Sequence, residues 1–249
     1  MKVRIKFSKY GAMKFIGHLD IMRYFQKAFR RADIDIAYSQ GFNPHQLMSF
    51  AAPLGVGITS DGEYLDVQLN SCDGKEVMID RLNAEMVYGI DITDFSILDD
   101  KCKNSMSLVA AADYKISLKD GYNAEFESFK NDFAGKFSQF YNQDFINIVK
   151  KSKKSEKEVD IKPLIYDITF EKDNNHQTVA EKFDNGLCVY MSLACGSEEN
   201  LKPELVMEAF CNYLSLEFNK FAYQIHRIET YAKDNEELIP LSKKDVINE

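Results

Sequence analysis

Hydrophobic and polar residues alternate at the start of the chain and then change to a helical period. Val3, Ile5 and Phe7 alternate with polar residues, which predicts a half-buried strand. After Gly17 the apolar positions recur at spacings of three and four, as on one face of an α-helix. These positions are Ile21, Met22, Phe25, Ala28, Phe29 and Ala32. The first 32 residues therefore predict a strand followed by an amphipathic helix.

The rest of the first 100 residues continues this alternation of strands and helices. Apolar runs at 47–54, 64–69 and 90–98 predict strands, and the spacing of apolar residues over 74–86 predicts a helix. Glycines at 55, 57 and 62 separate the first two of these strands. The predicted order is β-α-β-β-α-β.

A second series of elements follows a polar bridge at 99–107, and it repeats the same order with an added hairpin. The predicted elements are a strand at 114–118, a helix at 123–141, strands within 145–149 and 159–170, a strand at 187–193, a helix at 200–218 and a strand at 223–231. With right-handed crossovers, each series gives an antiparallel sheet covered by two helices. The sequence therefore predicts an α+β protein of two tandem ferredoxin-like units, 1–100 and 108–249.

Charge is distributed unevenly along the chain, and this narrows the possible partners. The 249 residues carry a formal net charge of −8, but residues 1–45 hold nine Lys and Arg against three acids, which gives +6 there and −14 in the remainder. A protein with this balance would contact nucleic acid through a local surface only. A basic run at 150–157 has two interpretations, a solvated hairpin tip or an arm that contacts phosphate.

Cysteine and histidine positions indicate neither a metal site nor a cofactor site. The five cysteines form no CxxC pair, and the four histidines show no ligand spacing. The chain also contains no GxGxxG and no P-loop. An odd number of cysteines, with no signal peptide in MKVRIKFSKY, leads us to expect reduced thiols and a cytoplasmic location. No apolar run approaches ~20 residues, so we expect no membrane span.

The candidate site lies on the predicted helix after Gly17 and on the loop that follows it. A basic stripe on the helix and a loop with aromatic, amide and imidazole side chains form a candidate surface for an anion or RNA. Its residues are Arg23, Lys27, Arg30, Arg31, Tyr38, Gln40, Phe42, Asn43 and His45. The alternative is a solvated helix face beside a loop whose side chains satisfy only its own backbone.

Several stretches of the chain carry a family resemblance. They are RIKFSKYGAMKFIGHLDIMRYFQKAFRRADIDIAYSQGFNPH, then SFAAPLGVG and GEYLDV, and later VDIKPLI and GSEENLKPELV. Together they resemble a bacterial family called radical-SAM-associated proteins, a domain of unknown function, over about residues 3–230. The resemblance implies a partner, because this domain lies beside or is fused to a radical-SAM protein with a cobalamin-binding region. The chain lacks the CxxxCxxC of a radical-SAM cluster and is therefore not itself that enzyme.

Three functions remain open from the sequence. The first is a non-catalytic accessory protein that binds structured RNA or presents a substrate. The second is a metal-independent ribonuclease with His18 or His45 as general base; by architecture alone, tandem ferredoxin-like units with basic loops are similar to CRISPR repeat-processing RNA endonucleases. The third is a module that docks the radical-SAM partner through its basic face.

Overall fold

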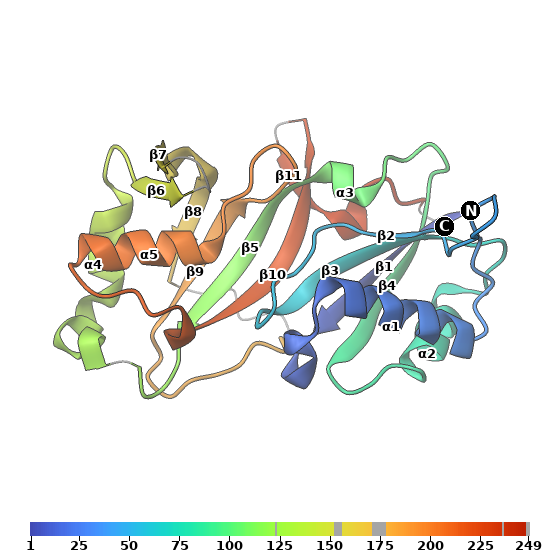
Figure 1. The fold of residues 1–249 in the computed structure, drawn as a ribbon, viewed down its shortest axis with the longest axis horizontal. Helices are drawn as coiled ribbons and strands as arrows, with labels where there is room; N and C mark the ends of the chain where they lie inside the picture. The colour runs from blue at the N-terminus through green and yellow to red at the C-terminus, as the bar shows by residue number, and fades with distance from the viewer. Residues whose placement is uncertain (123, 152–155, 171–177, 236, 248–249) are drawn as a thin grey trace.

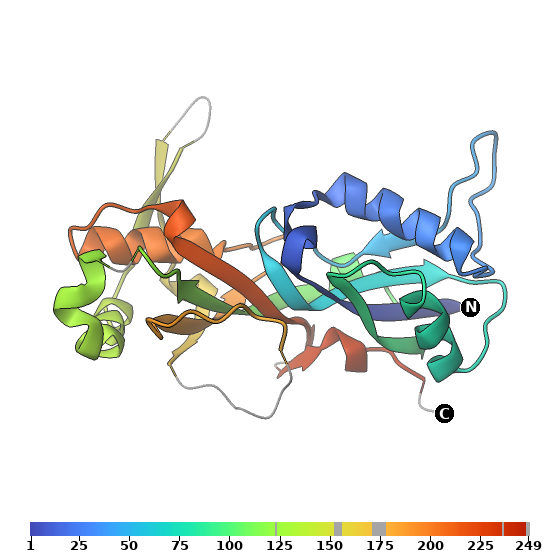
Figure 2. The same cartoon turned by 90° about the horizontal axis from the view of Figure 1, so that it is seen from below.

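The computed structural model describes residues 1–122, 124–151, 156–170, 178–235 and 237–247, and its main feature is one large, mostly antiparallel sheet (Figures 1 and 2). Its strands are β1 (Lys2–Lys9), β2 (Met48–Phe50), β3 (Thr59–Gln68), β4 (Ile90–Leu98), β5 (Val109–Leu118), β8 (Ile165–Thr169), β9 (Cys188–Ala194), β10 (Tyr223–Asp234) and β11 (Glu237–Pro240). The α-helices of the described residues are α1 (His18–Arg31), α2 (Lys75–Asn83), α3 (Ser105–Leu108), α4 (Phe133–Tyr141) and α5 (Pro203–Tyr213). The protein is thus a mixed α and β structure.

The strands follow the order β4-β1-β3-β10-β5-β9-β8 across the sheet. β2 pairs with β3 on one side, and β11 pairs with β10. β6 (Asn147–Lys151) and β7 (Glu156–Asp160) form a separate two-stranded hairpin. The basic run expected at 150–157 falls in this hairpin, and its residues 152–155 lie outside the part that the structure describes.

The two halves of the chain meet where β3 and β10 pair in parallel, at Thr59 with His226 and at Ser60 with Arg227. Gly62 lies at this junction, and a Cβ atom there would be 2.5 Å from Cα of Glu229. Only glycine fits such a close approach of two backbones. The sequence predicted two separate antiparallel sheets, whereas this parallel pairing joins all the strands from β4 to β8 into one.

The N-terminal half has its own hydrophobic core, which α1 and α2 form with β1, β3 and β4. The predicted apolar stripe of α1 is confirmed, because Ile21, Phe25, Ala28 and Phe29 are buried. On β1 the alternation holds for Val3, Ile5 and Phe7, but Arg4 and Ser8 on the other face are buried too. Arg4 is buried because the C-terminal segment covers it, as its contacts with Leu241 and Lys244 show.

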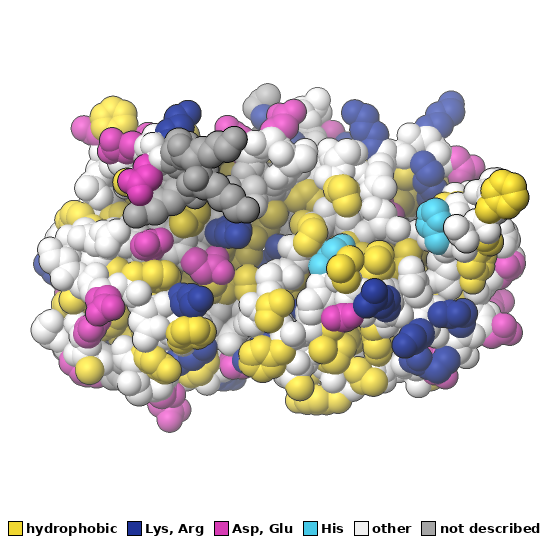
Figure 3. All heavy atoms as spheres, in the orientation of Figure 1, with side chains coloured by type: hydrophobic (Ala, Val, Ile, Leu, Met, Phe, Trp, Pro, Cys, Tyr) yellow, Lys and Arg dark blue, Asp and Glu magenta, His cyan; other side chains and the backbone are white. Residues whose placement is uncertain are grey.

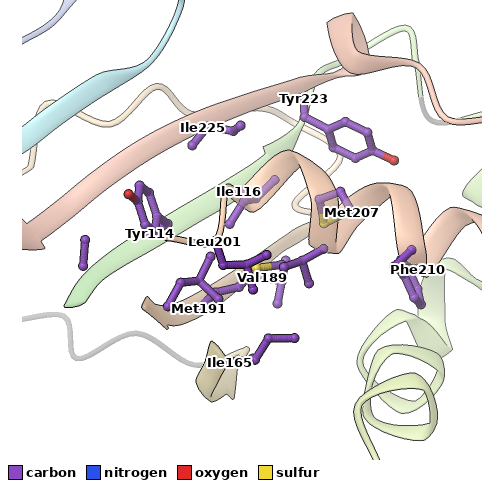
Figure 4. Packing of buried hydrophobic residues seen from close by; sticks show 14 of the residues in the cluster. Tyr114, Ile116, Ile165, Val189, Met191, Leu201, Met207, Phe210, Tyr223 and Ile225 are labelled. Carbon is purple, nitrogen blue, oxygen red and sulfur yellow. The ribbon is translucent and has the colours of Figure 1, made fainter. Parts of the chain in front are cut away.

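The C-terminal half packs α4 and α5 against β5, β9 and β10 (Figure 4). Phe137 of α4 and Phe210 of α5 are in ring contact, with centroids 4.3 Å apart. Side chains such as Ile116, Val189 and Met207 fill the space between the sheet and α5. In Figure 2, α1 and α5 lie on the same side of the sheet.

Several predicted boundaries were wrong where local geometry interrupts a hydrophobic period. The single helix expected at 123–141 is divided at Phe129 (φ −134°, ψ 22°) into a 3₁₀ segment, η2 (Ala124–Asp132), and α4. β2 ends at Phe50, before Pro53, which lacks a backbone N–H for pairing. β3 begins at Thr59, five residues before the predicted strand, because its polar first half pairs with β1 and β10.

Candidate functional site

The predicted basic stripe is exposed on α1, and Figure 3 shows Lys and Arg side chains gathered over this helix. Two members are ion-paired with the chain's own carboxylates. Arg23 Nη1 lies 3.2 Å from Asp20 Oδ1, and Arg31 Nε lies 2.8 Å from Glu85 Oε2. For Lys27 and Arg30 we find no carboxylate partner within the described residues. The cations best placed for an external anion are therefore Lys27 and Arg30.

The predicted loop is the tip of a hairpin that Tyr38 and Gln46 close by an isolated β-bridge. Across the tip, Ser39 N donates to His45 O at 2.8 Å, and Ser39 Oγ lies 2.8 Å from His45 Nδ1. Gly41 has φ +112°, a left-handed conformation that favours glycine. The tip is thus a closed turn whose backbone is held by its own hydrogen bonds.

Aromatic and amide side chains of this tip face solvent. Phe42 is completely exposed, at 105%, and Tyr38 is 46% exposed. Gln40, Asn43 and His45 are exposed as well. These side chains are therefore accessible from solvent.

One backbone carbonyl connects the loop with the basic stripe. The carbonyl oxygen of Gln26, on α1, accepts from Arg30 Nε at 3.3 Å and from Gln46 Nε2 at 3.3 Å. Gln46 Nε2 also donates to the Tyr38 hydroxyl at 3.4 Å. The structure therefore places Arg30 and Tyr38 near the base of the loop.

His18 lies apart from this surface, at the first residue of α1. Twelve residues separate it from Arg30, which is about 18 Å along a helix axis. The imidazole packs edge-on against Phe50, with ring centroids 5.4 Å apart, and borders a small cavity of about 10 Å³. Lys9 and Glu63 line the same cavity. A space of this size holds about one water molecule, so no substrate group enters it.

Lys9, Glu63 and Arg227 form a buried charged group that sequence reasoning missed. Arg227 Nη1 lies 3.0 Å from Glu63 Oε1, and both side chains are at most 6% exposed. Burial lowers the pKa of Lys9 below its ordinary value, and the charge of Glu63 opposes this effect. No local signal could have identified the pair, because 164 residues separate its members.

A second buried pair, Asp61 and His226, lies beside the junction of the two halves. His226 Nε2 is 3.0 Å from Asp61 Oδ2, and His226 Nδ1 is 2.9 Å from Thr59 Oγ1. Burial alone would raise the pKa of Asp61, but hydrogen bonds from His226 and Thr178 outweigh it and lower that pKa. Thr59 and His226 are buried, whereas Asp61 is partly exposed and lines a groove on the same side of the sheet.

The open face of the sheet is acidic. A groove of about 830 Å³ on this face is lined by five carboxylates, while Lys6 is the basic residue among its lining residues. The carboxylates are Asp61, Asp91, Asp113, Asp167 and Glu229. Lys6 lies on the face of β1 opposite Ile5 and Phe7, which belong to the core under α1. This face therefore carries mainly acidic side chains, in contrast to the exposed cations on α1.

Two absences hold for the part of the chain that the structure describes. Its His, Cys, Asp and Glu side chains include no group of three or more that could hold a metal ion. None of its helices combines the length and the apolar character needed to cross a membrane.

Comparison with known proteins gives a family but no activity. A family described as an uncharacterized protein conserved in bacteria (DUF2344) matches residues 2–203. No curated protein matches the chain.

Proposed function

The chain belongs to the DUF2344 family of uncharacterised bacterial proteins, and we propose that it is a non-catalytic accessory protein that binds RNA through its basic N-terminal face. The observation that carries the proposal is the Gln26 carbonyl, which accepts hydrogen bonds from both Arg30 and Gln46. This contact puts a cation of the stripe beside the base of a loop that exposes Tyr38 and Phe42. Cations next to exposed aromatic rings are what unpaired nucleotides require.

Each part of this surface has a distinct role. Lys27 and Arg30 contact phosphates, because they have no competing carboxylate among the described residues. Phe42 and Tyr38 stack on bases, while the amides of Gln40 and Asn43 hydrogen-bond to base edges. Arg23 and Arg31 contribute less, because binding would have to compete with Asp20 and Glu85.

Charge reversal tests this function. In Lys27→Glu plus Arg30→Glu, we expect weaker binding of single-stranded and hairpin RNA and a smaller salt dependence. Two lost phosphate contacts reduce the slope of log K against log[salt] by about 1.4. The measurement is fluorescence anisotropy at several salt concentrations, with Lys101→Glu plus Lys103→Glu as a control of equal charge change at exposed positions away from α1. Equal RNA affinity and slope for the two double variants would reject the proposal.

A ribonuclease is the second candidate, and the contact of His45 Nδ1 with Ser39 Oγ at 2.8 Å favours it. This contact orients an imidazole within the proposed RNA surface, as a general base requires. RNA cleavage that disappears in His45→Ala but persists in His18→Ala would support an enzyme. Unchanged cleavage in the double variant His18→Ala plus His45→Ala would exclude both histidines as general bases.

The same basic face fits an acidic protein surface, and the family resemblance suggests a radical-SAM protein as partner. In this arrangement the accessory protein presents a substrate to the enzyme in the cytoplasm. Co-purification of the two proteins, repeated with Lys27→Glu plus Arg30→Glu, separates docking from RNA binding. Retained co-purification with lost RNA binding would assign the face to RNA.

We also propose that each half, 1–100 and 108–249, is a ferredoxin-like unit. The strand order β4-β1-β3-β2 in the first half and β10-β5-β9-β8 in the second supports this. In each half, the first strand along the chain lies between the fourth and the third, and the second strand pairs with the third. This is the strand order of the split βαβ arrangement.

A further inference from the structure

A cavity of about 380 Å³ lies where the two halves of the chain meet. The segment between β2 and β3 forms one side, and the loop between β9 and α5 forms the other. Its walls are mainly aliphatic, with Ala52, Pro53, Ile58, Met106, Val109 and Leu201 among them. The face in Figure 3 is hollowed near its middle, between the positions of α1 and α5 in Figure 1. This volume and composition are typical of a small-molecule site.

Arg227 lines this cavity and is only 5% exposed. Its Nη1 atom is engaged by Glu63, at 3.0 and 3.3 Å, and by the carbonyl of Ala52, at 3.3 Å. Its Nε atom is buried and has no hydrogen-bond partner. The ring of Tyr114 lies beside it, 5.7 Å from the guanidinium carbon. A buried guanidinium donor without an acceptor is unusual, and it marks a position where a ligand oxygen would be stabilised.

The amino end of α5 borders the same cavity through Lys202, Pro203 and Glu204. No side chain caps this helix. Pro203 has no backbone N–H and the N–H of Leu205 donates to the carbonyl of Lys202 at 3.0 Å, so the start of α5 contributes mainly the partial positive charge of the helix. Glu204 Oε2 is buried and likewise has no hydrogen-bond partner. The cavity thus combines one unpaired donor, Arg227 Nε, with one unpaired acceptor, Glu204 Oε2.

These two atoms restrict the ligand. Arg227 is neutralised by Glu63, and Lys202 balances Glu204, so the site favours a ligand with no net charge. A phosphate would meet the carboxylate of Glu204, and a nucleobase would find only Tyr114 as an aromatic surface among the lining residues. A zwitterion satisfies both unpaired atoms, because its carboxylate accepts from Arg227 and its ammonium donates to Glu204.

We propose that this cavity binds a free α-amino acid with an aliphatic side chain. The carboxylate lies at Arg227 Nε and the start of α5, the ammonium lies at Glu204, and the side chain lies against the aliphatic wall. This site is separate from the RNA surface on α1, and its occupancy does not depend on that function.

Isothermal titration of the full chain with L-leucine, L-isoleucine, L-valine and L-methionine tests the site. We expect saturable one-to-one binding of at least one of them. N-acetyl-leucine, which lacks the ammonium, and leucinamide, which lacks the carboxylate, are each expected to bind at least tenfold more weakly. The absence of saturable binding by all four amino acids would overturn the proposal, as would tighter binding of guanosine or inorganic phosphate.

Glu204→Gln tests the role of the unpaired acceptor without disturbing the Arg227–Glu63 pair. We expect it to weaken amino acid binding at least tenfold. Glu208→Gln is the matched control, because it makes the same change at an exposed position of α5, and we expect it to bind as the parent does. Lys27→Glu plus Arg30→Glu should also leave amino acid binding unchanged, which keeps this test independent of RNA binding. Equal affinities for Glu204→Gln and Glu208→Gln would contradict the assignment.

Discussion

Arg4 connects the N-terminal strand to the end of the chain, and its removal is predicted to be among the most destabilising single changes. Its side chain is 1% exposed. Nε and Nη2 contact the two carboxylate oxygens of Asp66 at 2.8 and 3.1 Å. Nη1 donates to the carbonyls of Leu241 and Lys244 at 2.9 and 3.0 Å. These contacts hold residue 4 against residues 241 and 244, near the other end of the chain.

Arg4→Met keeps the aliphatic part of the side chain and removes all four of these contacts. It leaves Asp66, at 13% exposure, with a hydrogen bond from the backbone of Ser105 as its remaining described partner. Removing one partner of a buried ion pair typically costs about 3–5 kcal/mol. For a protein of this size that corresponds to a decrease in Tm of roughly 6–20 °C.

Urea unfolding followed by far-UV circular dichroism measures this effect, since the chain has no tryptophan to report by fluorescence. The control is Arg23→Met, because Arg23 and Asp20 form an ion pair at 68% and 67% exposure. For that exposed pair we expect a loss below about 0.5 kcal/mol. If Arg4→Met lies within about 1 kcal/mol of the parent, the buried-pair reasoning is wrong.

Three further predictions concern the junction and the acidic groove. Gly62→Ala should destabilise the protein by about 1–3 kcal/mol, because its Cβ would lie 2.5 Å from Glu229 Cα; an unchanged urea midpoint would show that the junction relaxes. Burial raises the pKa of the Asp113 carboxyl above 3.8, its ordinary value. Protonated Asp113 therefore stabilises the folded protein below pH 3.8, and this stabilisation is lost as the pH rises through the raised pKa. Asp113→Asn should therefore gain stability relative to the parent as the pH rises. The pKa of Asp61 is lowered, so Asp61→Asn should lose stability above pH 3.8, and that loss should vanish as the pH falls through the lowered pKa. Urea midpoints measured between pH 3 and 7 check both pH dependences. If the midpoints of the two variants change with pH in the same way, both predictions are refuted.

The sequence by itself determined the type and order of most elements and the two faces of α1. Hydrophobic period is a local property, so Ile21, Phe25 and Phe29 identify the buried side of that helix without any knowledge of its neighbours. The exposed position of Lys27 and Arg30 follows from the same period. The loop after this helix was predicted from its residue types alone, and its Gly41 adopts a left-handed conformation that favours glycine.

The tertiary structure decided everything that depends on residues distant in the sequence. The Arg227–Glu63 pair joins residues 164 apart, and the Arg31–Glu85 contact joins residues 54 apart. The break at Phe129 likewise interrupts a stripe of phenylalanines that reads as one continuous helix. Pairing of β3 with β10 merges the two halves and creates the cavity between them. Periodicity reports which side of an element is buried, but it contains no information about which element covers that side.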